Sequence, residues 1–205
     1  MKEGRAEYNS TDILNFPVGT IISKTFYYPS TPDGEVKKTA DLQPVTQQKG
    51  LALANHHLIE TRLLVHREAG WEPLSYVWNA EQSDAKLTRI GDLKTLTLKD
   101  PGRKTDFSYL VPNINQCAGC HAPNNTTREL KPIGPKARHL NGVYNYTDGP
   151  MNQIDKWLEL GYLSAVPQQR PQAAIWDNQD ASLDARARAY LDINCAHCHL
   201  SLIHI

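Results

Sequence analysis

All four cysteines of this 205-residue chain lie in two copies of one short pattern, in which Cys-x-x-Cys is followed directly by His. The copies read CAGCH at residues 117–121 and CAHCH at residues 195–199. This pattern is the attachment signature of c-type haem. Two thiols about one helical turn apart can each form a thioether with a haem vinyl group, and the adjacent histidine is then held beneath the ring as the proximal iron ligand. The pattern therefore predicts two covalent haem c groups.

The match to the motif assigns a role to each of its residues. We expect His121 and His199 to be the proximal iron ligands. The covalent haem anchors are expected to be Cys117, Cys120, Cys195 and Cys198.

Two other uses of paired cysteines fit less well. A redox disulfide does not call for a histidine after the second cysteine. Structural zinc is held by pairs that lie much closer together than these two motifs. Histidine occupies 8 of the 205 positions, so two pairs would both be followed by His by chance in about 0.2% of cases.

The distal ligand of the first haem is predicted by elimination. Met1 and Met151 are the only methionines, so a thioether ligand from this chain must be Met151, in the expected loop 149–151. A methionine that fills a core gap before the next helix is the alternative interpretation. His139 is the other candidate distal ligand, although a solvent-facing loop histidine fits its pattern better. The distal ligand of the second haem is expected to lie outside this chain.

The charge balance excludes several classes of partner. The 22 Lys and Arg equal the 22 Asp and Glu, whereas nucleic-acid binders and polybasic membrane-surface proteins carry a basic surplus. No apolar run approaches the 18–20 or so residues of a spanning helix. We expect redox partner proteins and no nucleic acid.

The first half of the chain reads as β-rich. Segments dense in β-branched and aromatic residues, or alternating with period two, predict strands at 21–28, 57–66, 71–78, 93–98 and 107–111. Ala69-Gly70 is a plausible hairpin connection between the second and third of these. A small antiparallel sheet or sandwich fits this layout.

After Pro112 the pattern becomes helical. A helix is expected over residues 152–160, with Gly161 just past its end. Ser182 is expected to cap a second helix over 183–195, which would place both thiols of the second motif on its last turn. The predicted fold class is thus α+β, with an antiparallel β-rich domain at 1–111 and a mostly α, cytochrome c-like haem-binding region at 112–205.

Several strings resemble a family of bacterial dihaem c-type cytochromes without a settled physiological role. Residues 186–199, RARAYLDINCAHCH, resemble its second haem site, and residues 132–141 resemble the segment after its first haem. Residues 16–20, 59–65 and 73–79 resemble its N-terminal β-rich region. The resemblance covers residues 16–199 and implies a dihaem electron carrier.

Both ends of the chain look incomplete. Thioether attachment of haem implies export to the periplasm or another extracytoplasmic space, yet residues 1–5 lack the apolar segment of a signal peptide. The last six residues, LSLIHI, are what CTGTCTCTTATACACATC would encode, and that string is similar to a transposase adapter used in sequencing libraries. The alternative is an ordinary short apolar C-terminus. We therefore expect a fragment, and we assign no role to His204.

Two classes of function remain open. The chain is expected to be an electron-transfer protein, and the alternative is a dihaem redox enzyme such as a peroxidase, with one open distal haem site. A third interpretation makes the β-rich region a docking module. Haem coordination separates the first two, because a carrier has two six-coordinate haems and a peroxidase has one that is five-coordinate.

Overall fold

The structure is a computed structural model that describes residues 4–39, 46–47, 50–51, 55–100, 102–124 and 126–199. These residues form two compact units. The β-rich unit holds the described residues of Ile21–Val65 and Glu72–Cys117, and the helix-rich unit holds those of Met1–Thr20, His66–Trp71 and Ala118–Ile205. The mixed α+β class is confirmed. The domain boundary near residue 111 and the cytochrome c-like character of the second region stay predictions.

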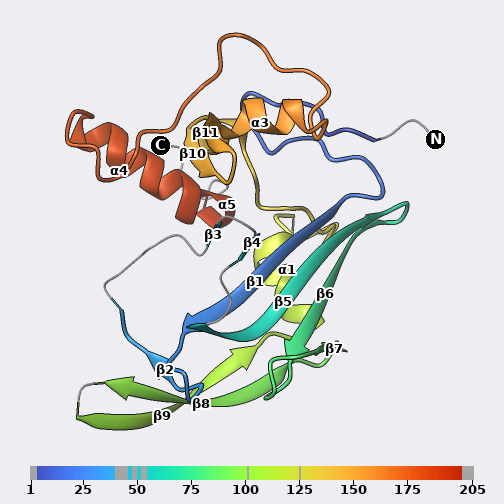
Figure 1. The fold of residues 1–205 in the computed structure, drawn as a ribbon. Helices are drawn as coiled ribbons and strands as arrows, with labels where there is room; N and C mark the ends of the chain where they lie inside the picture. The colour runs from blue at the N-terminus through green and yellow to red at the C-terminus, as the bar shows by residue number, and fades with distance from the viewer. Residues whose placement is uncertain are drawn as a thin grey trace. The chain divides into compact units, whose positions relative to one another are not determined.

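The larger sheet has the strand order β1-β5-β6-β7 (Figure 1). Its strands are β1 (Ile21–Pro29), β5 (His56–Arg67), β6 (Gly70–Trp78) and β7 (Ala85–Thr88). β1 pairs antiparallel with β5, from Ile21 opposite Val65 to Pro29 opposite His56. The predicted hairpin between β5 and β6 is present, and Gly70 accepts the positive φ of +112° that its turn requires. Of these four strands, the pattern analysis missed only β7.

A second sheet has the order β2-β8-β9. It comprises β2 (Val36–Lys37), β8 (Asp92–Asp100) and β9 (Arg103–Val111). β8 and β9 form a regular antiparallel hairpin, whereas the short β2 runs parallel to β8. The expectation of a purely antiparallel region is therefore wrong at β2, where a long connection lets the strand approach in either direction. A further small pair joins β3 (Thr46–Gln47) and β4 (Gly50–Leu51).

The β-rich unit has an apolar core and a buried charge. The core groups Val36, Ile59 and Leu96, with aromatic side chains packed against them. Glu60 is fully buried, and its carboxylate accepts hydrogen bonds from Arg62, Ser75 and Tyr109. Burial acts to raise the pKa of Glu60, but these donors together hold that pKa below its usual value.

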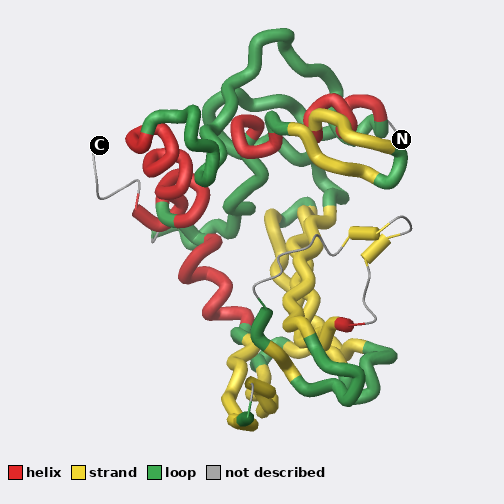
Figure 2. Tube along the Cα trace, turned by 60° about the vertical axis from the view of Figure 1, so that its left-hand side comes forward, coloured by secondary structure: helices red, strands yellow, loops and turns green. Residues whose placement is uncertain are grey.

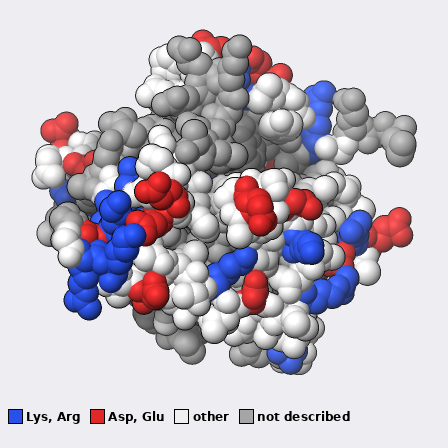
Figure 3. All heavy atoms as spheres, turned by 60° about the horizontal axis from the view of Figure 1, so that its bottom comes forward, with Lys and Arg blue, Asp and Glu red and all other residues white. Residues whose placement is uncertain are grey.

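Charged residues of both signs are neighbours on the surface of the β2-β8-β9 sheet. Lys38 pairs with Asp100 at 2.6 Å, and Lys104 pairs with Glu35. Figure 3 shows basic and acidic side chains close together on the face that it draws. Basic and acidic side chains, which are equal in number in the whole chain, are therefore also paired with one another on this sheet.

The helix-rich unit is built from short elements (Figure 2). They are α2 (Ala137–Leu140), β10 (Val143–Tyr146), β11 (Gly149–Asn152), α3 (Gln153–Glu159), α4 (Leu183–Asn194) and α5 (Ala196–His199), while α1 (Ile114–His121) leads into the unit. β10 and β11 pair as an antiparallel hairpin. The predicted helix is present as α3, capped by the Asn152 side chain and followed by Gly161 at a φ of +74°.

The core of this unit joins residues near the start of the chain to residues of its second half. Its buried residues are Ala6, Leu14, Ala137, Ile154 and Leu163. Bridges join Ala6 to Leu163 and Ile13 to Lys136. The described residues before Ile21, which the sequence pattern assigned to the β-rich region, thus pack with elements that lie more than a hundred residues later.

Candidate haem-attachment sites

The first motif lies on α1, which has a defined beginning. The Asn113 side chain accepts a hydrogen bond from the Gln116 backbone N–H at 3.0 Å, and the Gln116 side chain accepts one from the Asn113 N–H at 2.9 Å. This reciprocal pair satisfies two donors at the helix start, as in a capping box. The Ile114 N–H also donates to the Arg89 carbonyl at 3.1 Å. The capping pair thereby sets where the helix that presents the thiols begins.

The two thiols of this motif are spaced for one ligand. Cys117 is half-buried and Cys120 is exposed, and the Cys117 thiol lies 3.5 Å from the Asn113 carbonyl. Residues three apart on a helix project on the same side. Both sulfurs are therefore on one side of α1, as attachment to two vinyl groups of one ring requires.

His121 is held in a defined tautomer. Its Nδ1 lies 2.8 Å from the carbonyl oxygen of Lys131, and the Lys131 N–H donates to the His121 carbonyl at 2.7 Å. A carbonyl only accepts, so Nδ1 must carry the proton. In the neutral ring the lone pair is then on Nε2, and a hydrogen bond of this kind is what orients metal-binding histidines. His121 is therefore prepared to bind a metal through Nε2.

The second motif begins where α4 ends. The Ser182 side chain accepts a hydrogen bond from the Ala185 N–H, so the predicted cap is confirmed. The helix stops at Asn194, because Cys195 leaves helical geometry with φ −124° and ψ −31°, and α5 follows at Ala196. The expectation that both thiols lie on the last turn of α4 is therefore wrong.

Around the second motif, Cys195 is half-buried and His199 is exposed, while the Cys198 side chain lies outside the described part of the structure. The His199 N–H donates to the Cys195 carbonyl at 3.1 Å. Nδ1 of His197 is buried and makes no hydrogen bond to any described residue. A buried ring nitrogen of this kind is suited to a polar group of a bound ligand.

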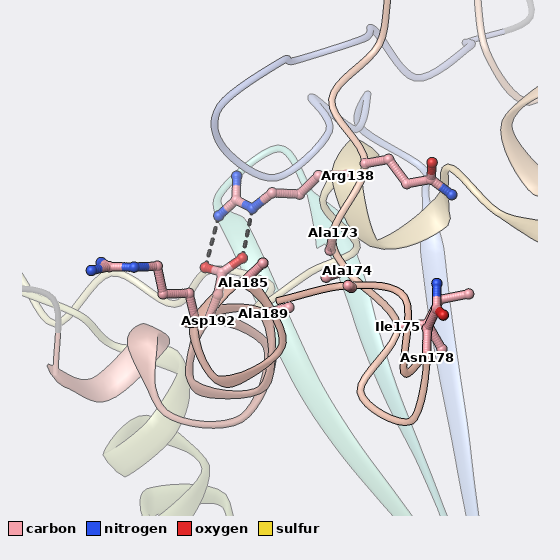
Figure 4. Close-up of a pocket in the computed structure, with 11 residues that line it drawn as sticks. Arg138, Ala173, Ala174, Ile175, Asn178, Ala185, Ala189 and Asp192 are labelled. Atoms are coloured by element: carbon pink, nitrogen blue, oxygen red, sulfur yellow. Dashed lines mark hydrogen bonds and ion pairs between the residues drawn. The ribbon is translucent and has the colours of Figure 1, made fainter. Parts of the chain in front are cut away.

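Asp192, three residues before Cys195, is the strongest attachment of α4 to the rest of the unit. Arg138 donates to its carboxylate from Nε at 2.6 Å and from Nη2 at 2.8 Å (Figure 4). His139 Nε2 lies 2.7 Å and Lys136 Nζ 3.2 Å from the same carboxylate. Hydrogen bonding from Arg138, supported by His139 and Lys136, holds the pKa of Asp192 far below its usual range despite partial burial.

The candidate distal ligands are placed differently from the expectation. Met151 is half-buried on strand β11 opposite Tyr144, so the predicted loop at 149–151 is wrong, because residues 143–152 close into a hairpin. His139 is not a solvent-facing loop residue, since it lies on α2 with its side chain 13% exposed. Its Nε2 is bound to Asp192 and is therefore not available to iron in this arrangement.

Two adjoining cavities lie against α4. The larger, of about 740 Å³, is lined by residues of α4 up to Asn194, by residues 138–143 and by residues 172–176. The smaller, of about 470 Å³, is lined largely by alanines of α4 and of the loop before it, with Arg138 and Asp192 at one side (Figure 4). The second motif thus starts at the residue that follows the wall of the larger cavity.

The residues present fit a covalently held haem. Neither α1 nor α4 buries any of its residues, although both contain apolar ones. On α4, the predicted apolar face includes Leu183, Tyr190 and Leu191, and all three are at least half exposed. A large apolar ligand beside α4 would cover such surface. Among the described residues, no group of three or more His, Cys, Asp or Glu forms a purely protein-made metal site.

The motif analysis missed the residues that support the two sites. Lys131 acts through its backbone carbonyl, which leaves no trace in a side-chain pattern. In the sequence, Asp192 and its basic partners appear only as charged residues separated by a long stretch of chain, with nothing to show that they meet. The asparagine and glutamine of the helix start, three residues apart, are the one signal that sequence reasoning could have used.

No protein family, curated protein or solved structure was found to match this chain. Within the described residues, no helix is both long enough and apolar enough to cross a membrane.

Proposed function

We propose that this protein is a dihaem c-type cytochrome that transfers single electrons through two covalently attached haems. The observation that carries the proposal is the coincidence of a Cys-x-x-Cys-His motif with a histidine whose Nδ1 is bound to a backbone carbonyl, which leaves Nε2 for iron. The second copy of the motif, at residues 195–199, supports a second site.

The chain's own residues would fix and orient each group. Cys117 and Cys120 would hold the first haem to α1, and Cys195 and Cys198 would hold the second at the end of α4. His121 and His199 would be the proximal ligands, with Met151 as the proposed distal ligand of the first haem. When bound, haem c supplies an iron that alternates between the ferrous and ferric states.

Two further proposals follow from covalent haem attachment. The cofactor implies export, so the working location would be the periplasm or another extracytoplasmic space. One-electron chemistry implies redox partner proteins as donor and acceptor. The equal numbers of acidic and basic residues support protein partners over nucleic acid.

The test is a count of covalent haems. The chain, fused to an export signal and expressed together with a haem-maturation system, is expected to give two haems per chain in a pyridine haemochrome assay. Cys195→Ala with Cys198→Ala should leave one haem, and Cys117→Ala with Cys120→Ala should leave the other. A wild-type chain that carries one haem or none would refute the proposal.

A second measurement separates a carrier from an enzyme. Electron transfer predicts two six-coordinate, low-spin haems in the absorption and electron paramagnetic resonance spectra. A five-coordinate haem that reacts with peroxide would instead identify a dihaem peroxidase.

A further inference from the structure

The larger cavity beside α4 has an unusual lining. Five large apolar side chains face it, and each is more than half exposed: Val143 (73%), Ile175 (57%), Trp176 (67%), Tyr190 (57%) and Ile193 (54%). Proteins rarely leave so much apolar surface uncovered in one place unless it binds something. The volume of about 740 Å³ lies in the range of small-molecule and cofactor sites.

The walls of this cavity are tied together by polar contacts. Arg138 holds Asp192 of α4 through two hydrogen bonds, and the Arg186 side chain of α4 donates to the Trp176 carbonyl at 2.7 Å. The Ala173 N–H in turn donates to the Arg138 carbonyl at 2.9 Å. Figure 4 shows the Arg138–Asp192 pair between α4 and the loop that carries Ala173 and Ala174. These contacts join α4 to the two segments that form the rest of the cavity wall.

The position of the second motif identifies the occupant. Asn194 lines the cavity, and Cys195 is the next residue along the chain. A ring joined to Cys195 through a thioether must lie against the surface next to the end of α4. The charge is also suitable for the two carboxylates of a haem, because the lining of this cavity includes Arg138 and no acidic residue.

We infer that this cavity is the binding site of the second haem. One face of the ring would lie against Tyr190 and Ile193 of α4. The other face would lie against the wall formed by Val143, Ile175 and Trp176. This inference rests on the proposed function. It assigns a binding role to residues that lie up to 52 positions before the motif.

The first test places a charge in the cavity wall. Val143→Glu and Val143→Lys are made with Cys117→Ala and Cys120→Ala, so that only the second haem reports. A carboxylate beside the ring stabilises ferric iron and an ammonium stabilises ferrous iron. We therefore expect Glu to lower the reduction potential of this haem and Lys to raise it. The matched controls Val18→Glu and Val18→Lys, at an exposed valine of the same unit that does not line the cavity, should leave the potential unchanged.

A second measurement does not depend on the Val143 variants maturing. Oxidative footprinting by mass spectrometry compares the haem-loaded wild-type chain with the Cys195→Ala, Cys198→Ala variant. Trp176 and Tyr190 should be oxidised several-fold less in the loaded chain. Tyr162 is equally exposed but outside the cavity, so its oxidation should not change.

The outcomes keep the two proposals apart. If the chain without Cys117 and Cys120 carries no covalent haem, the proposed function fails at the second motif. Two results would refute this binding site and leave the proposed function standing. In the first, the haem is present but its reduction potential does not depend on the sign of the charge at residue 143. In the second, Trp176 is oxidised equally in the haem-loaded chain and in the variant without the second haem.

Discussion

His121 and Lys131 are joined by two hydrogen bonds, one from the histidine Nδ1 to the Lys131 carbonyl and one from the Lys131 N–H to the backbone carbonyl of His121. The first sets the tautomer of the ring, and the second fixes the end of α1 against the segment that follows. A histidine so restrained would lose little freedom on binding iron. This relationship is the clearest physical support for a haem at the first motif.

Met151 is predicted to be the distal ligand of the first haem. We expect Met151→Leu, made with Cys195→Ala and Cys198→Ala, to abolish the weak far-red sulfur-to-iron band of the oxidised protein. The reduction potential should fall and added imidazole should bind, because the thioether that favours ferrous iron is gone. Leucine keeps the packing volume. An unchanged spectrum and potential would mean that Met151 only fills space on β11.

The capping pair of α1 is expected to contribute measurably to stability. Asn113→Ala removes the side chain that accepts the Gln116 N–H, and should lower the free energy of unfolding by about 1 kcal/mol in denaturant titrations. Asn115→Ala is the matched control, because Asn115 is an exposed residue within the same helix, where alanine is tolerated or favoured. Equal losses in the two variants would contradict the role of the cap.

Asp192 should make the free energy of unfolding depend on pH in the acidic range. Its pKa is lowered in the folded protein, chiefly by Arg138, so its stabilising effect is complete above the ordinary carboxyl pKa and is lost as the pH falls towards the folded value. Asp192→Asn should cost roughly 2 kcal/mol at neutral pH and flatten the acid dependence of the unfolding free energy below about pH 4. Asp184→Asn, on the exposed start of the same helix, should do neither. A variant at 192 with the wild-type acid profile would exclude this linkage.

Glu60 is expected to be indispensable to the β-rich unit. Glu60→Gln leaves Arg62 without its charged partner beside a fully buried site, and should cost about 3 kcal/mol in the free energy of unfolding. Because the pKa of Glu60 is also lowered, the wild-type contribution should be present above the ordinary glutamate pKa and fade as the solution is acidified below it. Glu81→Gln, at an exposed position, serves as the control. A loss no greater than that of the control would show that the buried network is neutral.

Features that depend on near neighbours in the chain could be predicted from the sequence. Five strands, the α3 and α4 helices and the Ser182 cap follow from side-chain periodicity and from local hydrogen bonding, and all are present. Reasoning from near neighbours also explains two errors. Met151 lies in a two-strand hairpin and not in the expected loop, and the backbone leaves helical geometry at Cys195, where the helix was expected to continue.

Which distant groups come into contact is set by the packing of the folded chain. The carbonyl that orients His121, the three basic residues that hold Asp192 across 53 to 56 positions, and the packing of Leu14 against Ile154 all require the chain to close long loops. The entropy cost of such closure grows only slowly with loop length, so side-chain packing and charge pairing select the partners, and no local pattern records that selection. The two Cys-x-x-Cys-His motifs are thus visible in the sequence, whereas the surroundings that would hold and orient the proposed haems depend on the fold.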